Sequence, residues 1–160
     1  MKRLPLILLS GLLLAAGLIP APRALAADKP ELNVTTLSGA SFELSAQRGK
    51  WVIVNYWATW CRPCIHEMPA LSKFVNSHAN VTAIGLAFED ADVATLKAFL
   101  AKHPVSYPIA KVDPAKPPAA FAAPLALPTT YLVAPDGAVA RHFVGPITPA
   151  DLEQAIGTGR

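Results

Sequence analysis

The only two cysteines of the chain, Cys61 and Cys64, lie in a Cys-Arg-Pro-Cys tetrad. They directly follow the apolar, aromatic-rich run 51–57, and residues 65–77 have the pattern of a helix, so the pair is expected where a buried strand turns into a helix N-terminus. The first-turn N–H groups and the helix macrodipole at such a position favour a thiolate over a thiol. Two thiols one turn apart can also close a disulfide and reopen it. The spacing therefore predicts dithiol redox chemistry.

The two thiols are expected to have different roles. Cys61 is predicted to be the nucleophile, because its sulfur would be partly exposed at the helix start and Arg62 adds a positive charge that favours the thiolate. Cys64 lies one turn further in and is the natural resolving thiol, which attacks a mixed disulfide at Cys61 and releases the partner. The alternative is a permanent structural disulfide. Because the loop is so short, it would restrain the unfolded chain by only about 2 kcal/mol.

Metal and haem sites fit the sequence less well. A structural zinc ion usually has four ligands, and His66, the histidine nearest to the pair, follows Cys64 by two positions on a helix and so points elsewhere. Covalent haem attachment needs a histidine directly after the second cysteine, where this chain has Ile65. We therefore expect no resident metal ion or cofactor. Copper binding by the reduced thiols stays open as an alternative.

The first 26 residues have the pattern of an export signal. A basic start precedes a charge-free stretch at 4–22, and Ala-Leu-Ala at 24–26 offers the small-x-small pattern of a cleavage site. We predict a signal peptide at 1–26, followed by one exported domain at 27–160. The alternative is an uncleaved anchor, because residues 4–22 are just long enough to cross a bilayer and would tether the domain to the inner membrane.

The charge balance gives no reason to expect nucleic acid as a partner. The chain has 14 Lys and Arg against 11 Asp and Glu, but Lys2, Arg3 and Arg23 belong to the predicted leader, so residues 27–160 balance at 11 against 11. The basic excess therefore belongs to export. A mature chain of this length suits one domain with one core, and two cysteines are too few for a disulfide-stapled scaffold.

The hydrophobic pattern predicts strands at both ends and in the middle of the domain. Two alternating hairpins are indicated by the turns Ser38-Gly39 and Pro135-Asp136-Gly137. Residues 51–57 and 81–88 are too apolar to be half exposed and indicate buried strands. The full set of expected strands is 32–37, 41–44, 51–57, 81–88, a short one at 106–109, 129–134 and 138–144.

Three helices are predicted from the 3.6-residue period, and each has an inner face. Asp90 is expected to cap the second helix, whereas Thr148 and Asp151 form a capping box for the third, which Gly157 is expected to end. The order of elements is a β-hairpin, a βαβ unit and a ββα unit. The expected inward residues are Ile65, Met68, Leu71 and Val75 in the first helix, Val93, Leu96, Phe99 and Leu100 in the second, and Leu152 and Ile156 in the third.

Two motifs resemble the signatures of a known family. Residues 54–64 read Val-Asn-Tyr-Trp-Ala-Thr-Trp-Cys-Arg-Pro-Cys and precede Glu67-Met68-Pro69, and residues 127–133 read Leu-Pro-Thr-Thr-Tyr-Leu-Val. Together they are similar to the TlpA/ResA-like branch of the thioredoxin superfamily, over nearly all of residues 31–157. The resemblance implies an α/β thioredoxin fold, in which helices flank a mixed central sheet, with an N-terminal β-hairpin and a βα insertion of the TlpA/ResA type. One departure is the sequence Ala-Ala-Pro-Leu-Ala at 122–126, where many relatives have a glycine.

Glu67 is the candidate proton exchanger. It follows Cys64 by three positions and so shares that cysteine's helix face. Thioredoxins themselves place a buried acid on the preceding strand, at the position of Asn55, where this chain has an amide. The resemblance implies that Glu67 exchanges protons with the resolving thiol, and a partly apolar site would raise its pKa toward neutrality, which suits that role. The alternative is a solvent-facing glutamate that complements the helix dipole.

The resemblance also implies a partner-binding surface around the disulfide. The Leu-Pro-Thr signature indicates a cis peptide bond before Pro128, which would present the backbone of Leu127 to an incoming polypeptide as a strand-like edge. An ordinary trans turn proline is the alternative. Trp60 is expected to form an apolar rim beside the nucleophile. The predicted partner-binding residues are Trp60, Arg62, Pro63, Leu127 and Pro128.

We predict an exported thiol-disulfide oxidoreductase, a periplasmic enzyme that reduces protein disulfides. The resemblance implies clients such as apocytochrome c or copper-site assembly proteins, and a membrane-embedded electron donor that reduces the enzyme again. We expect a monomer. One alternative is a protein-thiol oxidant of DsbA type. Such proteins carry an inserted helical domain, for which the 39 proline-broken residues between Phe88 and Pro128 leave no room.

Another alternative is a copper-binding chaperone that uses Cys61 and Cys64 as ligands. Chaperones of the Sco type space their cysteines more widely and add a later histidine. His142 is the only candidate for that histidine, and its spacing does not match. A non-catalytic thioredoxin-like interaction module would be expected to lack one of the two cysteines.

Overall fold

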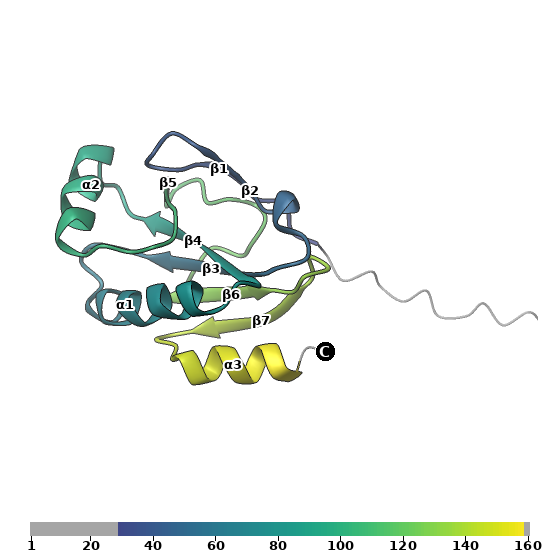
Figure 1. Cartoon of the computed structure of the whole chain (residues 1–160). Coiled ribbons are helices and arrows are strands. Elements are labelled where there is room, and N and C mark those ends of the chain that lie inside the picture. Colours follow the sequence, from purple (N-terminus) through teal and green to yellow (C-terminus); the bar gives the residue numbers. More distant parts are fainter. Residues whose placement is uncertain (1–28, 159–160) are drawn as a thin grey trace, which may run out of the picture.

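A computed structural model describes residues 29–158. The predicted signal peptide, its cleavage site and the possible tether at 4–22 lie outside the described residues. Within the described part of the chain, none of the helices is long and apolar enough to span a bilayer. The elements are β1 Asn33–Thr35, β2 Ser41–Glu43, a short 3-10 turn Ser45–Gln47, β3 Trp51–Trp57, α1 Arg62–Ser77, β4 Val81–Phe88, α2 Val93–Lys102, β5 Ile109–Val112, β6 Thr129–Val133, β7 Val139–Val144 and α3 Pro149–Thr158 (Figure 1).

The central sheet is mixed and has the strand order β5-β4-β3-β6-β7. β5, β4 and β3 are parallel, whereas β6 is antiparallel to both β3 and β7. β1 and β2 form a separate hairpin next to β5. A hydrogen bond of 2.7 Å from Leu37 N to Ile109 O joins this hairpin to β5. The α2–β5 segment is inserted between β4 and the β6–β7 hairpin, as expected for a TlpA/ResA-type thioredoxin fold.

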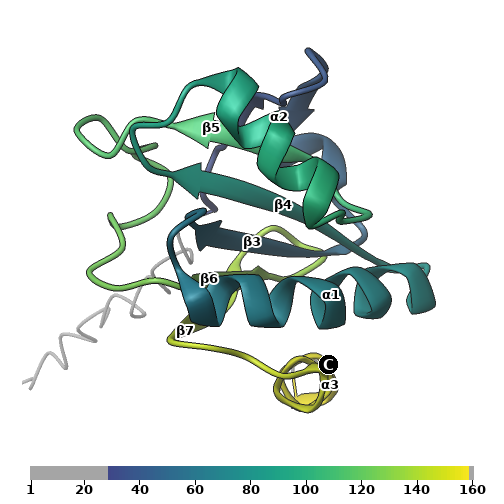
Figure 2. The same ribbon diagram turned by 90° about the vertical axis from the view of Figure 1, so that its left-hand side faces the viewer.

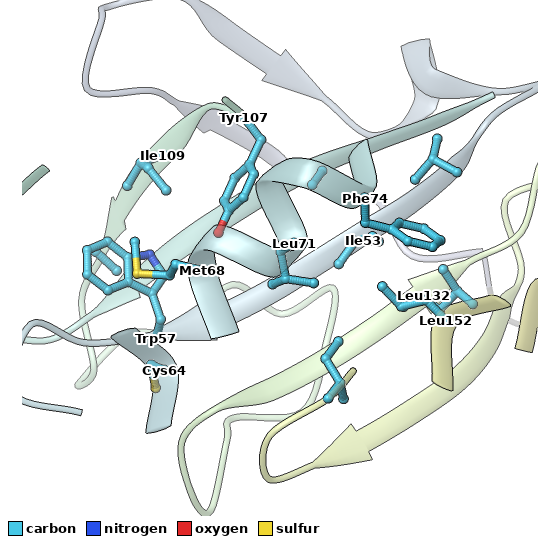
Figure 3. Packing of buried hydrophobic residues seen from close by; sticks show 14 of the residues in the cluster. Ile53, Trp57, Cys64, Met68, Leu71, Phe74, Tyr107, Ile109, Leu132 and Leu152 are labelled. Carbon is cyan, nitrogen blue, oxygen red and sulfur yellow. The ribbon is translucent and has the colours of Figure 1, made fainter. Parts of the chain in front are cut away.

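Both faces of β3 are covered, which explains why its sequence is apolar throughout. Ile53 and Trp57 lie in the cluster that joins the sheet to α1 and α3 (Figures 2 and 3). Leu96 of α2 belongs to the same cluster. Val54 and Tyr56 lie in the cluster on the opposite face, which the β1–β2 hairpin and Phe121 cover. All seven residues of β3 are buried. Asn55 is therefore a polar side chain in an otherwise apolar strand.

The first and second helices differ from the prediction in their inner faces. In α1, Met68 and Leu71 are buried as predicted, and Val75 is half-buried and packs against the core. Ile65 is also half-buried, whereas Phe74 is buried without having been predicted. The helix continues through Pro69. In α2, Leu96 is buried, but Val93 is 45% exposed. The predicted cap was wrong: Asp92, rather than Asp90, accepts a hydrogen bond from Thr95 N at 2.7 Å and begins the helix two residues later.

Two further boundaries differ from the prediction. The short strand after α2 is β5 at Ile109–Val112, three residues later than expected, because its pairing with Gly85–Phe88 of β4 sets its start. α3 has the predicted capping box, in which Asp151 Oδ2 accepts a hydrogen bond from Thr148 N at 2.8 Å. However, the helix continues through Gly157 to Thr158. Ile156 is half-buried and packs against the core as predicted, and Ala155 beside it is buried.

Gly85 lies where its neighbours on the helix-covered face of the sheet leave no room for a side chain. A Cβ atom at this position would collide with Ile109 and would lie 3.1 Å from Nε1 of Trp57. The register places Gly85 beside Asn55 of β3, which in turn pairs with Thr130 of β6. This row of residues crosses the sheet directly beneath the N-terminal half of α1, where the candidate site lies.

Candidate active site

Cys61 and Cys64 form a disulfide at the point where β3 passes into α1, with their Cα atoms 5.3 Å apart. Cys61 is the N-cap residue of α1, and its sulfur accepts a hydrogen bond from Cys64 N at 3.3 Å. A turn closed by Cys61 N and Ala58 O, at 3.1 Å, connects the strand to the helix. The sulfur of Cys61 therefore lies at the N-terminal, positive end of the helix dipole, and this position stabilises a thiolate.

The disulfide is more shielded than the sequence indicated. Cys64 is fully buried, as expected for a resolving thiol, but Cys61 is only 4% exposed rather than clearly accessible. Both cysteines belong to the core cluster under α1, and Leu127 of the neighbouring loop packs against this cluster. A partner must therefore approach Cys61 closely along the loop surface. The flanking residues are open to solvent: Trp60 is 68% exposed, and Arg62 and Pro63 are exposed.

Glu67 lies inside the protein, on the same face of α1 as Cys64. It is 4% exposed, and both carboxylate oxygens accept hydrogen bonds: Oε1 from Asn55 Nδ2 at 2.8 Å and Oε2 from Ile147 N at 2.9 Å. Burial raises the pKa of Glu67 from 4.5 to about 7, against the two hydrogen bonds, which lower it. The alternative of a solvent-facing glutamate is therefore wrong. A carboxyl group that titrates near neutrality can both take up and release a proton at physiological pH.

A second buried carboxylate holds the loop that leads to Cys61. Glu89 directly follows β4 and is 8% exposed. Its Oε1 accepts a hydrogen bond from Thr59 N at 2.7 Å, and its Oε2 accepts one from the Thr59 hydroxyl at 2.9 Å. Because β3 and β4 are parallel neighbours, their carboxyl ends meet at one sheet edge, and Glu89 lies beside the turn after β3. Sequence reasoning missed this residue. An acid directly after an apolar strand, at the same edge as the tetrad, was the signal that could have found it.

The Leu127–Pro128 peptide bond is cis, as the Leu-Pro-Thr motif indicated. Pro128 is buried and Leu127 half-buried, and the loop is held by hydrogen bonds from Thr129 Oγ1 to Ala126 O at 2.7 Å and from Gly145 N to Pro128 O at 2.8 Å. Leu127 packs against the cluster that contains both cysteines. The structure thus brings the two sequence motifs together, although 63 positions separate Cys64 from Leu127 in the chain.

A groove of about 400 Å³ extends from Trp60 along this loop. Trp60 and residues 124–127 line it, together with Phe88, Glu89 and Asp90 at the end of β4. Leu125 is fully exposed at its margin, with a relative exposure of 101%. The apolar side chains on both sides of the groove suit an extended polypeptide with apolar side chains. Glu89 and Asp90 make one end of the groove acidic. Residues 124–126, part of the segment in which the sequence departs from the family, line this groove.

Two further buried polar groups in this part of the core have no hydrogen-bond partners. The hydroxyl of Tyr107 and Nε1 of Trp57 are buried and form no hydrogen bond with any other residue in the range 29–158. Tyr107 points toward α1 (Figure 3). Burial, and secondly the negative charge of Glu67, raise the pKa of Tyr107, which therefore stays protonated. Within the described residues, no three His, Cys, Asp or Glu side chains are grouped as a metal site would require, and the ring of His142 stacks on Tyr131.

Comparison with known proteins agrees with this geometry. Residues 26–142 match the AhpC/TSA family. The chain is 32% identical over 130 residues to the thioredoxin-like protein YneN of Bacillus subtilis, covering 79% of this chain and 75% of that protein. It is 31% identical over 131 residues to the thiol-disulfide oxidoreductase ResA of Bacillus thuringiensis, covering 81% and 75%.

A solved structure of a putative thiol:disulfide interchange protein DsbE from Chlorobium tepidum superposes with a TM-score of 0.70 at 26% identity, covering 81% of this chain and 93% of that one. The chain belongs to the AhpC/TSA family and is a TlpA/ResA-like protein of the thioredoxin superfamily. A secreted disulfide oxidoreductase of Mycobacterium tuberculosis, homologous to DsbE of E. coli, superposes with a TM-score of 0.67 at 25% identity, covering 79% and 95%. This TlpA/ResA-like protein is therefore a thiol-disulfide oxidoreductase, and Cys61 and Cys64 form the disulfide in its described residues.

Proposed function

We propose that this TlpA/ResA-like protein is an exported reductant of protein disulfides, in which Glu67 moves the proton of the resolving thiol. The observation that carries this proposal is the burial of Glu67 on the face of α1 that also holds Cys64, with its pKa raised to about 7. A carboxylate with this pKa is a base of suitable strength for a thiol at neutral pH.

The first step uses the reduced enzyme. The Cys61 thiolate attacks one sulfur of a client disulfide, the client S–S bond breaks, and the second client sulfur leaves as a thiolate. The product is a mixed disulfide between Cys61 and the client. Two features of the site favour this step: the helix N-terminus stabilises the attacking thiolate, and the two hydrogen bonds from Thr59 to Glu89 fix the preceding turn.

In the second step Cys64 loses its proton to Glu67 and attacks the sulfur of Cys61. The mixed disulfide breaks, the client leaves with both of its sulfurs reduced, and the Cys61–Cys64 disulfide forms. Two electrons have passed from the enzyme to the client. Glu67 then releases its proton, and a membrane-embedded dithiol donor, expected from the family, reduces the enzyme for the next turnover.

The direction of electron flow is supported by the segment between β4 and β6. There the chain forms only α2, β5 and the loop that lines the groove, so the described residues include no inserted helical domain of the kind that DsbA-type oxidants carry. We also propose that residues 1–26 are a signal peptide, that 27–160 fold as one periplasmic domain, and that this domain is a monomer. Apocytochrome c and copper-site assembly proteins are the proposed clients.

The test is the pairing of an activity assay with client capture. The exported enzyme should catalyse insulin reduction by dithiothreitol, and at equilibrium with glutathione it should be mostly oxidised, as a strong reductant is. Cys64→Ala should hold the client on Cys61 as a mixed disulfide, whereas the matched variant Cys61→Ala should hold none. An enzyme that oxidises reduced proteins faster than it reduces insulin would contradict the proposed direction.

A further inference from the structure

Asn55 occupies the centre of the proton-transfer site and contacts two other polar side chains. Its Nδ2 donates one hydrogen bond to Glu67 Oε1 at 2.8 Å and a second to Thr130 Oγ1 at 2.9 Å. Asn55 is 1% exposed and Thr130 is fully buried. The amide oxygen Oδ1 is also buried, but it has no hydrogen-bond partner among residues 29–158. A buried acceptor without a partner is unfavourable, so this orientation of the amide is stabilised by what Nδ2 contacts.

The two hydrogen bonds of this arrangement favour the ionised form of Glu67, whereas burial favours the protonated form. Both carboxylate oxygens face donors, namely Asn55 Nδ2 and the backbone N–H of Ile147. A protonated carboxyl group has an O–H that needs an acceptor instead. The backbone N–H of Ile147 cannot become an acceptor, because the lone pair of its nitrogen is delocalised into the peptide bond. The Asn55 amide can, because a rotation of about 180° about its last side-chain bond exchanges Nδ2 and Oδ1.

Thr130 is compatible with both orientations of the amide. A hydroxyl group is both donor and acceptor. In the present structure Thr130 Oγ1 accepts from Asn55 Nδ2. After the rotation its hydroxyl would donate to Oδ1, at the same place in the sheet. The register, in which Asn55 and Thr130 are paired residues of β3 and β6, keeps the two side chains next to each other in either state.

We propose that Asn55 is a positioning residue whose side-chain amide turns over when Glu67 gains or loses its proton, so that a donor faces the carboxylate and an acceptor faces the acid. This inference rests on the proposed function, because it names the residue that accepts the O–H of Glu67 after Glu67 has taken the proton of Cys64. The proton passes from the Cys64 sulfur to Oε1 of Glu67, Asn55 then accepts the new O–H through Oδ1, and the amide returns when Glu67 releases the proton. No bond other than S–H and O–H is made or broken in this step.

Asn55 is the side chain that already hydrogen-bonds Oε1 of Glu67, so it is placed to accept a new O–H there. The titratable neighbours are Cys64, three positions earlier on α1, and Tyr107 ahead of β5, whose hydroxyl stays protonated because burial raises its pKa. On β3, β6 and the segment before α3, the neighbours are an amide, a hydroxyl and a backbone N–H, none of which titrates in this range. No Lys or Arg in the described chain forms an ion pair or hydrogen bond with Glu67 that could hold it ionised.

The direct test is NMR of the Asn55 side-chain amide in the wild-type enzyme. At pH 8.5 the Nδ2 protons should show strong nuclear Overhauser effects to the Thr130 side chain. At pH 5.5 these effects should weaken, with a midpoint at the pH where Glu67 titrates. In Glu67→Gln, which has no proton to gain, the pattern should not change with pH. Amide contacts that stay the same while Glu67 titrates would overturn the proposal.

Kinetics of release of the mixed disulfide give a second, independent readout. Asn55→Leu removes both donor and acceptor, and we expect the pH of half-maximal rate to rise by about one unit, which is about a tenfold loss of rate below it. Thr130→Val is the matched control, because it leaves the Asn55–Glu67 hydrogen bond in place, and its midpoint should move by less. Equal shifts in both variants would overturn the proposal. If Glu67→Gln itself turned over normally, the proton role of Glu67 would fail, while the NMR experiment would still decide whether the amide turns.

Discussion

Two buried carboxylates flank the disulfide, and they are held in different ways. Glu67 accepts its two hydrogen bonds from β3 and from the segment before α3, so three separate parts of the fold meet at one carboxyl group. Glu89 accepts both of its hydrogen bonds from Thr59 alone. Glu67 lies within the core, whereas Glu89 also lines the groove beside Trp60. This difference agrees with the proposal that Glu67 exchanges a proton, and with a role for Glu89 in fixing the turn that carries Cys61.

Replacement of Glu67 should have the largest effect on turnover. Glu67→Gln keeps the shape but removes the base, and general acid–base catalysis typically contributes about 100-fold or more to a rate. We therefore expect release of the mixed disulfide to slow by about 100-fold at pH 7, measured by stopped-flow with a disulfide peptide. Glu153→Gln, an exposed acid on α3, is the matched control and should react as the wild type does. Unchanged release across pH 6–9 would show that Glu67 is not the base.

Glu67 should also make folding stability depend on pH. Burial raises its pKa from 4.5 to about 7 in the folded protein, so the folded state prefers the protonated form. Below the unfolded value both states are protonated and there is no penalty. As the pH rises from about 4.5 to about 7, the unfolded state ionises first. The free energy of unfolding falls by about 3 kcal/mol in total over this range, with no further loss above about pH 7.

The measurement is urea denaturation of the wild type and Glu67→Gln at pH 4 and pH 8, with both proteins oxidised so that the cysteines do not titrate. From pH 4 to pH 8, the free energy of unfolding of Glu67→Gln should rise by about 3 kcal/mol relative to that of the wild type. A constant difference between the two proteins would mean that the pKa of Glu67 is not raised.

Replacement of Glu89 should act through the turn rather than through a proton. Glu89→Ala leaves Thr59 N without its acceptor and should cost roughly 2 kcal/mol of stability, because hydrogen bonds to charged groups are worth more than neutral ones. Attack of Cys61 on a disulfide should slow as well. Glu89→Gln can still accept from Thr59 N and donate to the Thr59 hydroxyl, so it should restore most of both losses. If Glu89→Gln were as slow as Glu89→Ala, the charge rather than the geometry of Glu89 would matter.

The groove should contribute the smallest effect, and only to client binding. Leu125 is fully exposed, so Leu125→Ala should leave the melting temperature unchanged but raise the KM for a protein client several-fold, as the loss of a buried contact of this size does at an interface. Val139→Ala, another exposed apolar residue on β7, is the matched control. A higher KM in both variants, or in neither, would argue against the groove as the client site.

The sequence predicted those parts of the fold and site that depend on local pattern. The apolar run of β3 and the turn Pro135-Asp136-Gly137 are local sequence signals. The observed strands β3, β6 and β7 therefore lie close to their predicted positions. The spacing of Glu67 from Cys64 likewise placed it on the buried face of α1. Inner faces of helices were less predictable, because packing decides them: Phe74 is buried and Val93 is exposed, although both are apolar and suitably spaced.

The parts that could not be predicted depend on contacts between distant segments. Glu89 becomes part of the site only because β4 pairs with β3, and Ile147 only because the β6–β7 hairpin brings its backbone N–H to Glu67. The degree to which Cys61 is shielded depends on the loop at Leu127, which is remote in the sequence. The amide at Asn55 was recognised as different from the acid of thioredoxins, but its contacts with Thr130 required the sheet register.

The pKa of Glu67 in the oxidised enzyme, the form that the structure shows, tests the account most directly. Infrared difference spectroscopy of the wild type against Glu67→Gln would isolate the C=O band of this one protonated carboxyl group as the pH is raised. We predict that the band disappears with a midpoint at about pH 7. A midpoint near 4.5, the ordinary value for glutamate, would contradict the account, because Glu67 would then be too weak a base to take the proton of Cys64.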